Sequence, residues 1–185
     1  MKRVVFLLEE PSSKEFLKSL MPRISDNLIT TFISFEGKSD LESNITRKLK
    51  AFNTPDTHFI VMRDQDNGDC IEIKRRIKQK CEQANKPETL IRIACRELES
   101  WYFGDLRSVE TALEISGIAE KYTNKEQYRL PDSIVNPKKE LKKITNNKYQ
   151  QISSSREIGK FIDYENNKSN SFNVLINTIK NIAKI

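Results

Sequence analysis

Glycine and cysteine are scarce in this chain of 185 residues, and each shortage excludes a class of protein. With only 5 glycines the chain contains no Gly-rich phosphate loop, which excludes both a P-loop and a dinucleotide-binding fingerprint. The 3 cysteines, Cys70, Cys81 and Cys95, have no CxxC spacing, so neither a disulfide framework nor a zinc site is indicated. A reducing cytoplasm is therefore the expected location.

Long apolar runs are also missing. No stretch approaches the roughly 20 apolar residues that a membrane-spanning helix needs, and Met1-Lys2-Arg3 leads directly into a short strand-like run instead of a signal sequence. We therefore expect no membrane association. Hydrophobic residues at 37% and charged residues at 31% are typical of a globular protein, and the length fits one domain with at most a small appendage.

Acidic residues become rare in the last quarter of the chain. Residues 1–135 hold 22 Lys/Arg and 22 Asp/Glu, whereas residues 136–185 hold 10 and 4, so the whole net charge of +6 lies there. Its densest part runs from Pro137 to Lys143. A basic region of this kind suits a nucleic-acid backbone, with Lys138 and Lys139 as candidate contacts. The alternative is a solvated, lysine-rich helix.

Short apolar runs alternate with amphipathic stretches in the first half of the chain. Strands are predicted at residues 3–8, 28–35, 58–63 and 90–95, and helices at 12–21, 39–52 and 69–84. Pro11 suits the start of the first helix, Ser12 or Ser13 can cap it, and Asp69 can cap the third. This alternation predicts an α/β fold with a parallel four-stranded sheet that helices cover on both faces.

After Cys95 the pattern becomes helical. Helices are predicted at residues 97–103, 106–116, 136–145, 154–163 and 171–184, with a polar loop at 122–132. We therefore predict an α/β domain at residues 1–104 and a helical extension at 105–185 that packs on it as one compact unit.

Acidic residues follow two of the predicted strands. Glu9 comes after the first strand, and Asp64 and Asp66 come at the end of the third. The carboxyl ends of strands form the ligand-binding edge of an open α/β sheet, and residues i and i+2 of an extended chain share a face. Carboxylates are the preferred ligands of Mg²⁺, so these three acids form a candidate metal site. The alternative is a polar turn after a strand.

A second candidate site follows the fourth strand. Glu97 lies at the expected strand–helix junction, where it is either part of the site or a favourable charge at a helix N-terminus. The aromatic run of Trp101, Tyr102 and Phe103 is interpreted as core. His58, at the opposite end of its strand, is not expected to act as a general base. Lys14, Arg63 and Arg96 lie near the acidic strand ends and are candidate contacts for a phosphate.

These residues resemble the pattern of Toprim domains, which are small α/β modules with a glutamate after the first strand and a DxD motif after a later one. Glu9, Asp64 and Asp66 match those positions, although Glu10 stands where the general pattern has glycine. The chain more closely resembles a Toprim-like bacterial family, domain of unknown function 4276. The matching segments are Phe6–Ser12, Arg63–Asp66, Arg96–Tyr102 and Asn167–Phe172.

The resemblance implies a site that uses Mg²⁺ or Mn²⁺ on phosphodiesters, as in topoisomerases, primases and overcoming-lysogenization-defect-type nucleases. It also implies a phage-defence or mobile-element setting with an ATPase partner. We therefore expect a metal-dependent nuclease in which Asp64 and Asp66 hold the metal, Glu9 completes the site or acts as acid/base, and Glu97 supports a second metal. The alternative is a non-enzymatic partner or regulatory subunit of an ATPase-containing complex.

Overall fold

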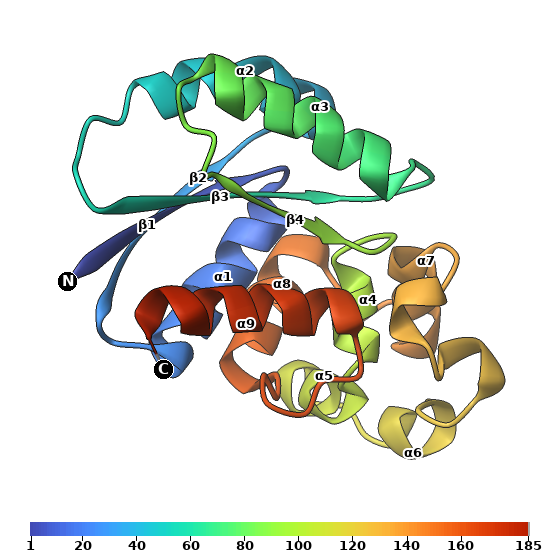
Figure 1. The fold of residues 1–185 in the computed structure, drawn as a ribbon. Coiled ribbons are helices and arrows are strands. Elements are labelled where there is room, and N and C mark those ends of the chain that lie inside the picture. The colour runs from blue at the N-terminus through green and yellow to red at the C-terminus, as the bar shows by residue number, and fades with distance from the viewer. Residues whose placement is uncertain (185) are drawn as a thin grey trace.

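The computed structural model describes residues 1–184, and its centre is an open parallel sheet between two layers of helices (Figure 1). The strands are β1 (Lys2–Leu8), β2 (Leu28–Ser34), β3 (Thr57–Asp64) and β4 (Leu90–Ala94). Their spatial order is β2-β1-β3-β4, and all three pairings are parallel, with Leu8 opposite both Ser34 and Met62. The predicted four-stranded α/β sheet is confirmed, and β1 and β3 are its central strands.

Three helices connect the strands. They are α1 (Pro11–Ile24), α2 (Lys38–Lys50) and α3 (Cys70–Gln83). Figure 1 shows α2 and α3 together on one face of the sheet and α1 on the other. The neighbouring strands β1 and β3 are followed by helices on opposite faces, α1 and α3, so their carboxyl ends form the switch point at which open α/β sheets bind ligands.

The starts of these helices test three predictions from the sequence. Pro11 occupies the first turn of α1, as predicted. The predicted cap at Ser12 or Ser13 is wrong, because the residue before the helix is Glu10 and no side chain caps its backbone N–H groups. The cap of α3 is confirmed, since the carboxylate of Asp69 accepts the backbone N–H groups of Ile71 and Glu72 at 2.8 and 2.9 Å.

Six further helices follow β4 within the described residues. They are α4 (Glu99–Phe103), α5 (Leu106–Leu113), α6 (Ile118–Tyr122), α7 (Pro137–Ile144), α8 (Gln151–Phe161) and α9 (Asn170–Ala183). In Figure 1, α8 and α9 lie on the same side of the sheet as α1. The α1–α8 contact is close, because a Cβ atom on Gly159 would lie 2.5 Å from the carbonyl oxygen of Phe16.

Two hydrophobic cores flank the sheet. The smaller lies under α2 and α3 and draws its buried side chains from Val5 to Ile93. The larger lies under α1, α8 and α9 and extends from Val4 to Ile182, so it contains residues from both sides of the predicted boundary at residue 104. The boundary itself stays a prediction. Trp101, Tyr102 and Phe103 are buried in this larger core, as predicted.

The segment at residues 122–132 differs from the predicted polar loop. It follows the short helix α6, which was not predicted, and it contains two 3₁₀ turns, at Glu126–Tyr128 and Pro131–Ser133. Tyr128 is 2% exposed, and its ring stacks on that of Phe103 with 4.9 Å between centroids. The prediction was wrong because one buried aromatic ring anchors an otherwise polar stretch.

No helix of residues 1–184 is both long enough and apolar enough to cross a bilayer. The predicted cytoplasmic location stays a prediction.

Candidate functional site

The central strands bring the first two predicted acids together. β1 and β3 are parallel neighbours, so Glu9 and Asp64 leave the sheet side by side at its carboxyl edge. Glu9 Oε2 accepts the backbone N–H of Asp64 at 2.9 Å, and Glu9 donates its own N–H to the carbonyl of Met62 at 3.2 Å. Both side chains are buried, with 6% and 7% of their surfaces exposed. The convergence predicted from two acidic strand ends is therefore present.

Asp66 lies differently from the prediction. The strand ends at Asp64, and Asp66 has a φ of +54°, so the extended backbone that would place the two aspartates on one face is absent. The chain turns at this point, where Gly68 donates to the carbonyl of Gln65 at 3.0 Å. The Asp66 carboxylate contacts Lys38 Nζ at 2.8 Å and Arg63 at 3.7 Å. It thus faces cations from α2 and β3.

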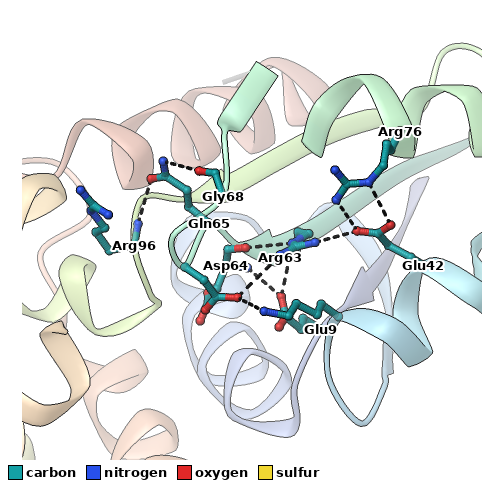
Figure 2. Close-up of polar contacts among 10 residues, drawn as sticks. Glu9, Glu42, Arg63, Asp64, Gln65, Gly68, Arg76 and Arg96 are labelled. Carbon is teal, nitrogen blue, oxygen red and sulfur yellow. Dashed lines mark hydrogen bonds and ion pairs between the residues drawn. The ribbon is translucent and has the colours of Figure 1, made fainter. Parts of the chain in front are cut away.

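Arg63 is the centre of a charged group that we call the outer cluster (Figure 2). Its members are Lys38, Glu42, Arg63, Asp66 and Arg76. The guanidinium of Arg63 is 4% exposed, donates to Glu42 at 2.6 Å and to the carbonyl of Asp64 at 2.8 Å, and lies 3.7 Å from Glu9. Arg76 also binds Glu42, at 3.1 Å.

Arg63 was predicted to contact substrate, and its burial fits another task, which is to hold the carboxylates around it. The positive charges also act on Glu42. Burial favours a higher pKa for that carboxyl, but Arg76 and Arg63 outweigh this effect and lower it.

The second group, which we call the inner cluster, consists of Glu9, Asp64 and Glu99. The pKa of Asp64 is raised well above its usual value, first by burial and then by the negative charges of Glu99, Glu9 and Glu10. Burial also raises the pKa of Glu9, against the hydrogen bond from Asp64 and the charge of Arg63. Glu9 and Glu99 both act on Asp64, and burial and this repulsion make the fully ionised cluster unfavourable without an added cation.

Glu99 was not predicted as a site residue. It opens α4, is 1% exposed, and accepts a hydrogen bond from the Tyr149 hydroxyl at 2.8 Å through Oε1. Its other oxygen, Oε2, is buried and has no hydrogen-bond partner among the described residues. Burial raises the pKa of Glu99 to about 7, although Lys138 and Tyr149 act in the opposite direction. No local signal in the sequence separates it from Glu97, because both acids follow the fourth strand within three residues of one another.

Glu97 occupies a different place from the one predicted. Its carboxylate accepts the backbone N–H of Lys138 at 2.8 Å, so it holds the first turn of α7 against the segment that follows β4. Lys138 is half-buried nearby. Burial alone would lower the pKa of Lys138, but the charges of Glu99, Glu10, Glu97 and Asp64 raise it overall. Lys138 is therefore a cation whose pKa is raised by carboxylates of the inner cluster.

Gln65 connects the segments that follow β3 and β4 (Figure 2). Its side chain accepts the N–H of Arg96 at 3.2 Å and donates to the carbonyl of Gly68 at 3.0 Å. Asp66 donates its own N–H to the carbonyl of Arg96 at 2.7 Å, and Arg96 has a φ of +64°. The two turns therefore hold one another in place.

Of the other predicted phosphate contacts, Arg96 is half-buried beside Asp66 and Glu97, Lys14 is half-buried in the first turns of α1, and Lys139 is exposed on α7.

A last group of contacts supports α4 from the side of α9. Asn167 donates to the carbonyl of Trp101 at 3.0 Å, and the Trp101 indole N–H donates to Ser171 at 2.9 Å. A Cβ atom on Gly104 would lie 1.9 Å from Asn167 Oδ1, so only glycine fits there. The segments 96–102 and 167–172, distant in sequence, therefore form one support for Glu99.

Comparison with known proteins gives one family. Residues 8–180 match the family described as domain of unknown function (DUF4276). The chain belongs to this family. The matched range contains every carboxylate of the inner and outer clusters. The C-terminal region of the OLD protein of Xanthomonas campestris pv. campestris is similar in structure, with a TM-score of 0.48, 12% sequence identity, and coverage of 100% of this chain and 97% of that chain. No curated protein matches the chain.

The inner cluster of this DUF4276 chain has the chemistry of a site for a hard divalent cation. Within residues 1–184 no three His, Cys, Asp or Glu side chains converge as a preformed metal centre. Mg²⁺, however, needs only one or two protein carboxylates, with water and substrate phosphates as its remaining ligands. The partnerless Oε2 of Glu99 and the mutual repulsion of the three acids fit such a cation.

Proposed function

We propose that this protein hydrolyses phosphodiesters with a bound Mg²⁺ or Mn²⁺, as a nuclease. The observation that carries the proposal is that the inner cluster holds three buried carboxyl groups with too little positive charge beside them to balance their ionised forms. Burial raises the pKa of Glu9, Asp64 and Glu99 alike, and within the described residues none of these three forms an ion pair shorter than the 3.7 Å contact of Glu9 with Arg63. A structural acid in such a place would normally be paired or replaced by an apolar residue.

Asp64, Glu99 and Glu9 are the residues that would hold the cation, and Asp66 would join them only by leaving Lys38. Bound there, a divalent cation polarises a phosphoryl oxygen and lowers the pKa of a bound water. Tyr149 fixes one oxygen of Glu99 and leaves the other for a ligand. Arg63 fixes the backbone at Asp64, so the carboxylate is held before any ligand arrives.

Lys138 supplies the positive charge for the phosphate. Its raised pKa keeps the ammonium charged at neutral pH, and it lies in the electrostatic reach of Glu99 and Asp64. A phosphate that enters beside this lysine meets a fixed cation on one side and the carboxylates on the other. Such preorganised charge is the main contribution that a protein makes to phosphoryl transfer.

The test is a titration of the protein with Mg²⁺ and Mn²⁺ by calorimetry, followed by cleavage of mixed single- and double-stranded DNA and RNA. Asp64→Asn keeps the side-chain volume and removes the charge. We expect it to fold, because the native carboxyl already favours its neutral form, and to lose cleavage by on the order of a thousandfold or more. Asp26→Asn, an exposed acid in the turn after α1, is the matched control and should cleave normally.

A folded Asp64→Asn protein with full activity would reject the proposal. Wild-type protein that neither binds metal nor cleaves would reject it as well and would favour a role as a partner subunit, for example of an ATPase. One observation favours that second candidate: Leu130 and Val135 are 69% and 64% exposed, and Val135 lines a notch beside Asp66 and Arg96. Stable association with another protein, without metal-dependent cleavage, would support it.

A further inference from the structure

Three hollows adjoin one another along the carboxyl edge of the sheet. The largest, of about 930 Å³, is a groove beside α7 and includes Glu97 and Asn136 in its wall. The same two residues line a notch of about 70 Å³, which also contains Asp66 and Asn67. Asp66 and Asn67 in turn line a hollow of about 430 Å³ between α2 and α3. Because neighbours share wall residues, the three hollows follow one another along this edge, and we call them together the track.

Cations lie along the whole length of this track. The α7 groove is lined by Lys138, Lys139, Lys142 and Lys143. The notch adds Arg96, and the hollow adds Lys38, Arg63 and Arg76, which Glu42 and Asp66 in the same wall already pair, so most of the unpaired positive charge lies in the α7 groove. The track begins on α7 and ends between α2 and α3, and Asp66, two residues beyond the end of β3, lines both the notch and the hollow.

The lysines of the α7 groove have few partners of their own. Among the described residues, no ion pair involves Lys139 or Lys142, and Lys143 has only a 3.7 Å contact with Glu140 while its side chain is 71% exposed. The one carboxylate in the groove wall, Glu97, already accepts the N–H of Lys138. Asn136, Asn146 and Asn147 add neutral donors that suit phosphate or sugar oxygens. The groove therefore presents four lysines against one carboxylate in its wall, which leaves it with a positive surface.

We infer that this track binds the sugar–phosphate backbone of a nucleic-acid strand, and that the α7 groove holds the part of the strand next to the reacting phosphate. The four lysines of the α7 groove match the repeated charge of a polymer, and the adjoining hollows give a longer strand a path that a mononucleotide would not use. The inference rests on the proposed function for the position of the reacting phosphate, and it adds the path that the substrate takes.

Binding can be measured apart from cleavage. The full chain with Asp64→Asn is titrated in EDTA, by fluorescence anisotropy, with single-stranded DNA and RNA from one to about 16 nucleotides. A variant that also carries Lys139→Gln, Lys142→Gln and Lys143→Gln is compared with a control that carries Lys18→Gln, Lys50→Gln and Lys168→Gln. The control removes the same charge from lysines outside the three hollows. Lys50 and Lys168 are exposed, and the side chain of Lys18 is half exposed. All six positions are at the surface, so each protein should fold, which circular dichroism checks.

We expect affinity to rise with oligonucleotide length until the strand covers the track. The logarithm of the binding constant falls linearly with the logarithm of the salt concentration, and each lost phosphate contact reduces this slope by about 0.7 for a single strand. The groove variant lacks three lysines, so its slope should be smaller by about 2. At about 0.15 M salt its affinity should be lower by on the order of fiftyfold. The control should bind like its parent. Equal binding by the groove variant and its parent would reject the inference, as would equal affinity for one nucleotide and for the longest strand.

The two proposals fail separately. Loss of length-dependent binding in EDTA rejects the track even if the wild-type protein cleaves with metal. Length-dependent binding through α7 by a wild-type protein that never cleaves would leave the track in place and reject the nuclease.

Discussion

The inner and outer clusters meet at the end of β3 and balance their charges in opposite ways. The outer cluster sets Lys38, Arg63 and Arg76 against two acids at distances from 2.6 to 3.7 Å. The inner cluster sets three acids against the charge of Lys138 and a single 3.7 Å contact, that of Glu9 with Arg63. Asp64 and Asp66 belong to one DxD motif and are separated by a single residue, yet burial and repulsion raise the pKa of Asp64 while Asp66 lies within ion-pair distance of two cations.

The difference separates residues that maintain the structure from residues that await a ligand. Opposite charges in the outer cluster satisfy one another, so its task is complete without any other molecule. The inner cluster is satisfied only by protons or by an added cation, and excess charge of this kind in a crevice is typical of functional sites. Three substitutions test this distinction.

Arg63→Met should have the largest effect on stability. It leaves Glu42 and Glu9 without their buried guanidinium, and breaking a buried ion pair from one side typically costs about 3 kcal/mol or more in the free energy of unfolding. Urea denaturation measures the loss. Arg76→Met is the matched control, since Arg76 binds the same Glu42 from a side chain that is 44% exposed, and it should cost below about 1 kcal/mol. Equal losses from the two arginines would contradict the outer cluster as a buried support.

Glu99→Gln should change how stability depends on pH. The pKa of Glu99 is raised from 4.5 to about 7 in the folded protein, so the folded state holds a proton that the unfolded state has released. The contribution of this group to stability therefore falls as pH rises from about 4.5 to 7, by about 3 kcal/mol in all. Glutamine removes that fall and can still accept the hydrogen bond from Tyr149, so without metal the variant should be more stable than wild type at about pH 8.

Denaturation in EDTA at a series of pH values measures this effect, and Glu15→Gln provides a control of opposite sign. The hydrogen bond from Arg156 lowers the pKa of Glu15, so its removal should destabilise the protein at high pH. Added Mg²⁺ should recover the stability of wild type at about pH 8 and have less effect on Glu99→Gln. A Glu99→Gln protein with the same pH profile as wild type would contradict the excess charge of the inner cluster.

Lys38→Gln should have the smallest effect on stability, because the lysine side chain is 56% exposed and such ion pairs contribute below about 1 kcal/mol. The substitution mainly tests the affinity of the protein for Mg²⁺. If Asp66 joins the inner cluster around the cation, Lys38 competes with the metal, and its removal should tighten Mg²⁺ binding by up to about fivefold. Calorimetry decides the point: an unchanged affinity would leave Asp66 in the outer cluster alone.

Much of the fold could be predicted from local pattern. Apolar runs such as Val4–Leu8 and Phe59–Met62 become the two central strands, and the carboxylate of Asp69 caps α3, because these features depend on burial and hydrogen bonds within a few residues. The meeting of Glu9 and Asp64 was also predictable, since parallel strands end at one edge. Which of Glu97 and Glu99 belongs to the inner cluster could not be predicted from the sequence. It depends on the left-handed turn at Arg96 and on where α4 begins, and neither follows from periodicity.

The remaining parts of the site come from elements far away in sequence. Lys38 and Glu42 reach the end of β3 from α2, Tyr149 reaches Glu99 from the segment before α8, and α7 returns to meet Glu97. Tertiary packing sets such contacts, and a single sequence carries no local pattern for them. Tyr128 shows the same limit on a smaller scale, since its burial against Phe103 depends on α4.

The two cores also set the order in which the sheet can be covered during synthesis. The core under α2 and α3 needs no residue beyond Ile93, so it can close once β4 has emerged from the ribosome. The core on the other face needs side chains as far as Ile182. At about 5 to 20 residues per second, that face of the nascent sheet lacks its α8 and α9 cover for roughly 5 to 20 s. During this interval the apolar side chains of that face, which α8 and α9 cover in the finished protein, stay exposed, and exposed apolar surface of this kind favours aggregation.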